Sequence, residues 1–167
     1  MNENQPDPNV AAARFVAYLR QLRDNRGAMA DLRCALSPTR RARAWPLLAR
    51  FGGIDHPTYE TVAGCFAYHP DETHTGNIGT TCSSLAAKFN SFDGRFRRLL
   101  SCDRAEIGER LRPVILAAKA RGVPVNYEEL FADLWFWSDR VKIRWAREYW
   151  GTPKADEIAV ATVETMP

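Results

Sequence analysis

Apolar residues recur at the spacing of an α-helix along most of this 167-residue chain. In the segment from Asn9 to Asn25 they stand at positions i, i+3, i+4 and i+7, so they share one face of a helix. These positions are Phe15, Tyr18, Leu19 and Leu22. The segment from Asp103 to Gly122 repeats the pattern, and no stretch alternates apolar and polar residues as a half-buried strand does. The sequence therefore predicts an all-α protein.

Short polar residues mark where several of these helices begin. Asn9, Asp103 and Asn126 are the predicted N-caps, because their side chains can accept a hydrogen bond from a free backbone N–H of the first turn. Pro113 lies inside the helix predicted after Asp103. Proline has no N–H to donate, so it is expected to kink or weaken that helix at a cost of up to about 3 kcal/mol.

The polar segment Asn90–Gly94 is the predicted boundary between two small helical bundles. The first predicted subdomain spans residues 9–90 and the second spans residues 91–152. Residues 153–167 are predicted to form a disordered tail. Another polar loop is expected from His69 to Gly79, between two helical segments.

The stretch from Trp135 to Gly151 holds four of the five tryptophans. At about 100° per residue, Arg140, Arg144 and Arg147 fall in one narrow stripe of a helix. Trp145 and Tyr149 lie together on another side and are expected to anchor the helix in a core. We therefore expect the tryptophans to hold this helix in place and the arginines to face an anion.

Arginine is the preferred cation throughout the chain, with 19 arginines against four lysines. Nine of the arginines lie in the first fifty residues, where there is no lysine. Arginine binds phosphate in a bidentate manner and stacks on bases, which lysine does not. The net charge of only +3 does not by itself establish a polyanionic partner. The local clusters do more to favour phosphate contact, including Arg95, Arg97 and Arg98 around Phe96.

Other chemistries find less support in the sequence. His69, Asp71, Glu72 and His74 lie close together, but without the helical spacing of zinc motifs. The Gly76–Gly79 stretch could cradle a phosphate at a helix start, but it lacks the Gly-Lys-Ser/Thr ending of a nucleotide-binding loop, and a plain turn is favoured. No nucleophile stands in a catalytic signature. We predict no metal, no cofactor and no enzymatic activity.

The four cysteines form no Cys-x-x-Cys pair and are expected to be small buried residues in a reducing cytosol. Charges at Arg14, Arg20 and Arg23 interrupt the first helical segment, so it is predicted to be neither a signal peptide nor a membrane span. A cytoplasmic protein without membrane contact is expected.

Several segments, taken in order, resemble the CasB/Cse2 family, the small subunits of the type I-E CRISPR surveillance complex Cascade. The resemblance spans roughly residues 10–152. Its segments are Val62-Ala-Gly-Cys-Phe-Ala-Tyr-His-Pro, Arg95-Phe-Arg-Arg-Leu-Leu with the Cys-Asp-Arg that follows, and Val141-Lys-Ile-Arg-Trp-Ala-Arg-Glu-Tyr-Trp-Gly. The last of these is the most specific part.

The resemblance implies a non-catalytic, two-subdomain, all-α subunit that sits as a pair along the crRNA-bearing backbone of Cascade. Its partners would be crRNA, the target or displaced DNA strand, and the backbone and large subunits. It would stabilise the R-loop in antiviral defence while a separate helicase-nuclease degrades the DNA. The alternative is a helical protein–protein adaptor whose basic surface meets acidic partners.

The predicted nucleic-acid contacts fall into two groups. The group that matches the family is Arg95, Arg97, Arg98, Arg144 and Arg147, with Arg140 and Lys142 just before the strongest match. The group from the basic N-terminal helices is Arg20, Arg23, Arg26 and Arg33.

Overall fold

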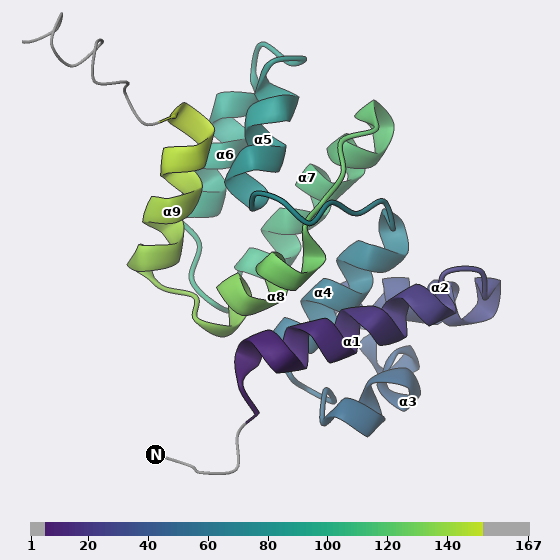
Figure 1. Cartoon of the computed structure of the whole chain (residues 1–167). Coiled ribbons are helices and arrows are strands. Elements are labelled where there is room, and N and C mark those ends of the chain that lie inside the picture. Colours follow the sequence, from purple (N-terminus) through teal and green to yellow (C-terminus); the bar gives the residue numbers. More distant parts are fainter. Residues whose placement is uncertain (1–5, 152–167) are drawn as a thin grey trace, which may run out of the picture.

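The computed structural model describes residues 6–151, and every regular element among them is a helix, which confirms the all-α prediction (Figure 1). The α-helices are α1 (Pro8–Leu22), α2 (Arg26–Arg33), α3 (Trp45–Leu48), α4 (Pro57–Tyr68), α5 (Ile78–Ala86), α6 (Phe92–Leu100), α7 (Ile107–Arg121), α8 (Tyr127–Trp135) and α9 (Asp139–Trp150). Three short 3₁₀ segments join them: η1 (Cys34–Leu36), η2 (Arg41–Arg43) and η3 (Ala49–Phe51). The predicted disordered tail, residues 153–167, lies outside the described residues, as does residue 152.

Helix α1 packs against α8, and α2, α7 and α8 pack against α4. Aromatic rings fill the centre of this group. Phe15 of α1 meets Tyr59 of α4 edge to face, with ring centroids 4.8 Å apart, and Tyr59 meets Phe131 of α8 in the same way at 5.0 Å. Such pairs add about 0.5–1.5 kcal/mol beyond the burial of their surface. The core therefore joins α1, α4 and α8, which are far apart in the sequence.

Helix α9 packs against α5, and α5 also packs against α6 and α7 (Figure 1). Trp145 is fully buried, and Gly79 of α5 lies against the backbone of Trp145, where a Cβ would collide with the Trp145 carbonyl oxygen. Phe96 of α6 stacks on Tyr149 of α9 at 3.9 Å. Trp145 and Tyr149 thus anchor α9, as the periodicity predicted, and the glycine at 79 is explained by close helix packing.

Two helices pack against partners from the other half of the chain. Helix α5 belongs to residues 9–90 but packs against α9, and α8 belongs to residues 91–152 but packs against α1. The buried apolar residues form one continuous cluster across both halves. A division into two subdomains at residue 90 stays a prediction.

Several helix boundaries differ from those expected. Helix α1 is capped by Asp7, whose side chain accepts a hydrogen bond from the backbone of Asn9, so Asn9 is not the N-cap. Helix α6 begins at Phe92, inside the segment expected to separate two subdomains. Asp103 caps the turn before α7, accepting from Ala105 and Glu106. Asn126 caps α8, as predicted.

Pro113 lies inside α7, which nevertheless runs unbroken from Ile107 to Arg121. Pro113 is exposed. The carbonyl of Glu109, which loses its N–H partner, can therefore be hydrated, and this limits the cost of the proline.

The His69–Gly79 loop is more strongly held than a solvated polar loop. His69 is buried and donates from Nε2 to the Val123 carbonyl at 2.7 Å, and the Tyr127 hydroxyl donates to the His69 carbonyl. Glu72 pairs with Val125 in an isolated parallel bridge. The segment is a polar loop, as predicted, but its first half is tied to the segment between α7 and α8.

All four cysteines are buried and unpaired, as predicted. Burial raises the pKa of the Cys65 thiol to about 12, so this thiol stays protonated and unreactive at neutral pH. Within residues 6–151, no helix has the length and apolar character that crossing a bilayer requires.

Candidate nucleic-acid interface

Basic side chains from the C-cap of α1, from α2 and from α7 surround a hollow of about 360 Å³, beside the C-terminal end of α4. We call it the α2–α7 hollow. Its cations are Arg23, Arg26, Arg33 and Lys119, and its floor includes Tyr68. Arg33 is oriented by a hydrogen bond from Nε to the Ala67 carbonyl at 3.1 Å. The fold thus gathers three of the predicted N-terminal arginines and adds a lysine from a helix 86 positions further on than Arg33.

Within residues 6–151, most of the positive charge at this hollow is free. Of its four cations, only Arg23 has an acidic partner there, Asp71 at 3.2 Å, and both side chains are more than half exposed. Exposed pairs of this kind contribute about 0–1 kcal/mol, so a phosphate can compete for Arg23. The Arg112 guanidinium lies 5.3 Å above the ring of Tyr68, which lines this hollow, and so places a further cation nearby.

A second hollow of about 220 Å³ opens between α6 and α7. We call it the α6–α7 hollow. Arg95, Arg98 and Arg110 line it, together with Pro113 and Val114. None of the three arginines has an ion pair within residues 6–151. Pro113, which the sequence left without a role, supplies an apolar wall here.

Arg97, the third predicted arginine of α6, points elsewhere. Its Nε lies 2.6 Å from Asp93 Oδ2, and its guanidinium lies 5.3 Å above the Trp150 ring. The hydrogen bond from Arg97 lowers the pKa of the Asp93 carboxyl. Arg97 therefore helps to join α6 to α9, and a phosphate would have to displace Asp93 to reach it.

The arginine stripe of α9 is divided by its ion pairs. Arg144 Nη2 lies 2.8 Å from Asp133 Oδ1, and its Nη1 lies 3.3 Å from Glu129 Oε1. Arg140 and Arg147 are exposed and, in the described part of the chain, have no acidic partner. Lys142 lies 5.6 Å from the centre of the Trp137 ring. The stripe thus offers two free guanidinium groups and one that is bound by α8.

The Asp133 carboxylate is the most deeply buried acid of the described chain, with 1% of its side chain exposed. It accepts hydrogen bonds from Trp145 Nε1 and Arg144 Nη2, each at 2.8 Å. Burial raises the pKa of Asp133 to about 6, against the opposing effect of the Trp145 hydrogen bond. Arg144 therefore has a structural task, the compensation of a buried carboxylate.

Arg20 is similarly committed. Its Nε and Nη2 bind Glu72 at 2.8 Å and 3.0 Å, and Nη2 also binds Glu128 at 2.9 Å. The hydrogen bond to Glu72 raises the pKa of Arg20 further above its ordinary value. Arg20 thus connects α1 with the His69–Gly79 loop and α8.

Sequence reasoning did not single out Arg110, Arg112 or Lys119. Arg112 and Lys119 stand seven residues apart, so they lie on the same side of α7. Their spacing indicates a basic side of α7, whereas the sequence pattern considered for this helix was only that of its apolar face. The proximity of Lys119 to Arg33 could not be seen without the packing of α4 against both α2 and α7.

The two alternative sites considered from the sequence are occupied by structural contacts. In the described chain, no group of three His, Cys, Asp or Glu side chains could hold a metal ion. Asp71 and Glu72 bind Arg23 and Arg20 instead. At the start of α5, Asn77 and Thr80 form a capping box, in which each side chain accepts a hydrogen bond from the backbone N–H of the other residue.

Comparisons with known proteins place these residues in a family context. The family model described as CRISPR-associated protein Cse2 matches residues 28–150. This range includes α6, α7 and α9 and begins after Arg26. A CRISPR-associated protein Cse2 from Thermus thermophilus is 36% identical over 77 residues, which is 44% of this chain and 44% of that relative. The matched segment thus spans less than half the length of this curated relative.

Solved structures extend the similarity to most of the chain. A CRISPR-associated protein of the Cse2 family from Thermus thermophilus matches with a TM-score of 0.72 and 27% identity, covering 84% of this chain and 98% of that one. A crystal structure of CasB from Thermus thermophilus gives a TM-score of 0.70 and 28% identity at the same coverage. CasB from M. ruber shares the fold, with a TM-score of 0.69 and 22% identity over 93% of this chain and 98% of its own.

Proposed function

The chain belongs to the family of CRISPR-associated protein Cse2, and on this premise we propose that it is a non-catalytic structural subunit of a type I-E CRISPR effector. In that role it binds nucleic acid through arginine-rich surfaces and stabilises the R-loop between crRNA and target DNA in antiviral defence. Its site of action is the cytoplasm.

The observation that carries this proposal is the clustering of free cations on both sides of α7. The α2–α7 hollow contributes Arg26, Arg33 and Lys119, and the α6–α7 hollow contributes Arg95, Arg98 and Arg110. Such clusters attract a phosphate backbone without reading its sequence, because their contacts are electrostatic and reach no base edges. Binding that does not depend on sequence suits a subunit that must act on every target DNA.

The energetics of the R-loop make modest contacts sufficient. The RNA–DNA heteroduplex is about as stable as the DNA duplex that it replaces, so the exchange is nearly balanced. A few phosphate contacts on the displaced or target strand can therefore shift it. Arg140 and Arg147 on α9 extend the proposed surface. Arg20, Arg23, Arg97, Lys142 and Arg144 stay predicted contacts, but the four arginines among them would have to exchange a carboxylate for a phosphate.

The proposed partners are crRNA, the target or displaced DNA strand, the backbone and large subunits of the effector, and a second copy of this chain within the complex. A second candidate function is a helical protein–protein adaptor. It is favoured by the number of arginines that already bind carboxylates on this chain, such as Arg20 and Arg144, because the same geometry would suit acidic partner surfaces.

Salt dependence separates the two functions. If about six phosphates are contacted, affinity for single-stranded DNA falls about 300-fold between about 50 and about 200 mM salt. The measurement is fluorescence anisotropy with the full chain and a labelled oligonucleotide of mixed sequence, repeated with RNA. Absence of binding to both at low salt, or a flat salt dependence, would overturn the nucleic-acid proposal and favour the adaptor.

A matched pair of variants tests the site itself. Arg95→Ala with Arg98→Ala removes two free cations from the α6–α7 hollow, whereas Arg40→Ala removes an exposed arginine that has no ion pair in the described chain and lines neither hollow. We expect the double variant to reduce the slope of log affinity against log salt by about 1.4, and Arg40→Ala to leave it unchanged. Equal slopes in both variants would remove the α6–α7 hollow from the proposed surface.

A further inference from the structure

A hollow of about 170 Å³ opens between the first turns of α1, the η3 segment and the start of α4. We call it the α1–η3 hollow. Its lining includes Arg14, Arg50 and Tyr59, with Val10 and Phe51 as apolar wall. It shares no lining residue with the α2–α7 and α6–α7 hollows. In Figure 1, α3 and the start of α1 lie at the bottom of the view and α6 lies near its top, so this hollow is separate from the α6–α7 hollow.

Aromatic rings bring the polar groups of this hollow together. Arg14 and Tyr18 stand four residues apart, so they are neighbours on one face of α1. The Arg50 guanidinium lies 4.8 Å above the Tyr18 ring and 5.7 Å above the Phe51 ring, and these contacts hold it beside that face. Arg14 also acts on the phenol of Tyr59: burial raises the pKa of Tyr59, and the positive charge of Arg14 opposes this rise. Two guanidinium groups and one phenol therefore converge on a single hollow.

All three groups are donors that lack an acceptor in the described chain. Within residues 6–151, neither Arg14 nor Arg50 has an ion pair, and the Tyr59 hydroxyl has no hydrogen-bond partner. Tyr59 is 5% exposed, and its raised pKa means that the hydroxyl keeps its proton at neutral pH. No acidic side chain of the described residues lines the hollow. The hollow thus presents three donors to an anion and no competing carboxylate.

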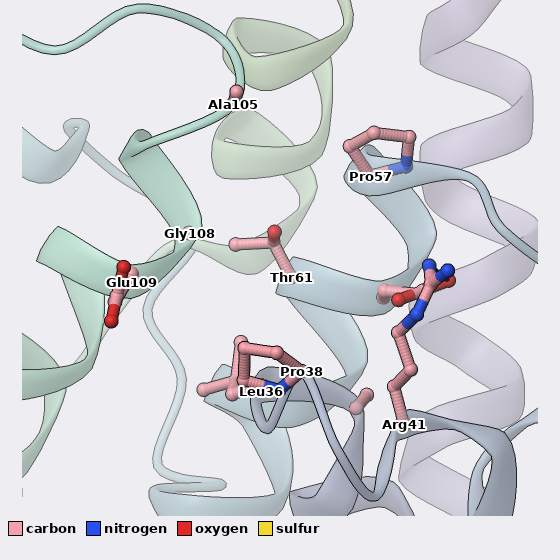
Figure 2. Close-up of a pocket in the computed structure, with 10 residues that line it drawn as sticks. Leu36, Pro38, Arg41, Pro57, Thr61, Ala105, Gly108 and Glu109 are labelled. Carbon is pink, nitrogen blue, oxygen red and sulfur yellow. Dashed lines mark hydrogen bonds and ion pairs between the residues drawn. The ribbon is translucent and has the colours of Figure 1, made fainter.

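A similar arrangement elsewhere in the chain already holds its carboxylate. At a cavity of about 450 Å³ between η1, α4 and α7, Figure 2 shows the guanidinium of Arg41. Arg41 Nη1 lies 3.3 Å from Glu60 Oε1, which also accepts from Trp45 Nε1 at 3.4 Å. A guanidinium and a donor on an aromatic ring together bind one glutamate there. The α1–η3 hollow has the same kinds of donor and lacks the glutamate.

We propose that the α1–η3 hollow is a docking site for a glutamate side chain of a partner protein, with the carboxylate bound by Arg14, Arg50 and Tyr59. Hydrogen bonds between guanidinium and carboxylate are charge-assisted and belong to the stronger class. Glutamate carries its carboxylate at the tip of a short apolar stem, which suits the walls formed by Val10 and Phe51.

A phosphodiester is the less suitable anion for this hollow. It lies between two sugars, so it cannot enter a recess tip first as a side chain does. The hollow is also smaller than the roughly 300 Å³ at which pockets for small molecules begin, so a whole nucleotide does not fit. The inference does not rest on the nucleic-acid proposal, and the DNA titrations described above leave it unaffected.

The first test uses short capped peptides as probes of the full-length protein. NMR spectra of the backbone amides and the arginine Nε–H groups are recorded with increasing amounts of acetyl-Gly-Glu-Gly-amide and of the same peptide with glutamine. We expect the glutamate peptide to shift the signals of Arg14, Arg50 and Tyr59, and the neutral glutamine peptide to leave them in place. Equal shifts with both peptides, or none with the glutamate peptide, would overturn the proposal.

Two further measurements separate a partner's glutamate from other anions. The dinucleotide dTpdT carries one phosphodiester, and we expect it to shift the signals of Arg14 and Arg50 less than the glutamate peptide does. Equal or larger shifts would assign the hollow to nucleic acid and contradict docking by a protein. The chain's own Glu3 stands three residues before Pro6, which also lines the hollow. Glu3→Gln should leave the affinity for the glutamate peptide unchanged, and a gain of more than about threefold would identify Glu3 as the occupant instead of a partner.

Variants locate the donors that are responsible. Tyr59→Phe keeps the ring in the core and should weaken the glutamate peptide about tenfold, because the hydroxyl donates to a charged group. Arg14→Gln alters an exposed residue with no ion pair in the described chain and should weaken binding about threefold. Arg40→Gln, also exposed but outside the lining of the hollow, is the matched control and should change nothing. Unchanged binding in both Tyr59→Phe and Arg14→Gln would contradict the assigned site.

Discussion

The sequence alone does not distinguish the arginines of α9 from those around α7, but the fold gives the two groups different surroundings. On α9, Arg144 is bound by the buried Asp133 and by Glu129. Around α7, Arg33, Arg98 and Lys119 stand beside other cations and have no acidic partner in the described chain. The cations around α7 repel one another unless an anion binds among them, whereas Arg144 is already paired with the Asp133 carboxylate.

This difference separates two uses of arginine. A guanidinium that compensates a buried carboxylate contributes to stability, and its removal leaves an unpaired charge in the interior. A guanidinium in a cluster of like charges contributes little to stability and is available to phosphate. The distinguishing quantity is the set of charges within reach of each guanidinium, which depends on tertiary packing.

The largest expected effect comes from the anchor of α9. Trp145→Ala should lower the free energy of unfolding by about 3–5 kcal/mol, because it leaves a cavity in the core and removes the Trp145 hydrogen bond to Asp133. Ile143→Ala on the same helix is the matched control, since 49% of Ile143 is exposed. Its effect should stay below about 1 kcal/mol. Urea unfolding followed by circular dichroism measures both, and similar losses would show that α9 is not anchored by Trp145.

The contribution of Asp133 to the free energy of unfolding depends on pH, and this tests the comparison between paired and free arginines. Its pKa in the folded protein, about 6, lies above the ordinary carboxyl value of 3.8, so the folded state binds the proton more tightly than the unfolded state. The contribution of Asp133 is therefore most favourable below about pH 4 and is lost as the pH rises through 6, by up to about 3 kcal/mol. Asp133→Asn should remove this component of the pH profile, whereas Asp139→Asn, exposed at the start of α9, should keep it. Unfolding free energies at pH 4.5, 6 and 7.5 measure the change. Parallel profiles for wild type and Asp133→Asn would contradict the assigned pKa.

Arg144→Ala should cost less than the loss of Trp145. At neutral pH it leaves the buried Asp133 carboxylate without its cation, and because Arg144 is itself 45% exposed the expected loss is about 1–2 kcal/mol. The loss should shrink at pH 5, where Asp133 is largely protonated. This revises the sequence-based prediction that Arg144 faces an anion of the binding partner, under which Arg144→Ala would weaken nucleic-acid binding with little change in stability. If that earlier expectation were met, Arg144 would belong with the arginines around α7.

The fold was predictable from the sequence to the extent that local periodicity decides it. The spacing of Phe15 and Leu19 on α1 and of Trp145 and Tyr149 on α9 identified the faces that the structure buries. Positions that depend on competition between neighbouring caps were predicted less well, and Asp7 replaced Asn9 because it stands one residue before the proline that begins α1.

The candidate site was predictable only in part, because ion pairing is a long-range property. Arg20 and Glu72 are separated by 52 positions and Arg33 and Lys119 by 86, so no local pattern distinguishes the first pair from the second. The family resemblance identified α6 and α9 correctly as basic helices, but it could not say that Arg97 faces Asp93 and Trp150 while Arg98 faces the α6–α7 hollow.

The smallest effect on stability, and the sharpest test of the comparison, is expected in the α2–α7 hollow. Arg26→Ala with Lys119→Ala removes two exposed cations that have no ion pair in the described chain, so the free energy of unfolding should change by no more than about 0.5 kcal/mol. Affinity for single-stranded DNA should nevertheless fall about tenfold at low salt, and the salt slope should decrease by about 1.4, since two phosphate contacts are lost. Anisotropy titrations at several salt concentrations, paired with urea unfolding, measure both quantities on the same samples. A variant that loses stability without losing affinity would place Arg26 and Lys119 with Arg144, and the distinction between paired and free cations would then no longer mark the nucleic-acid surface.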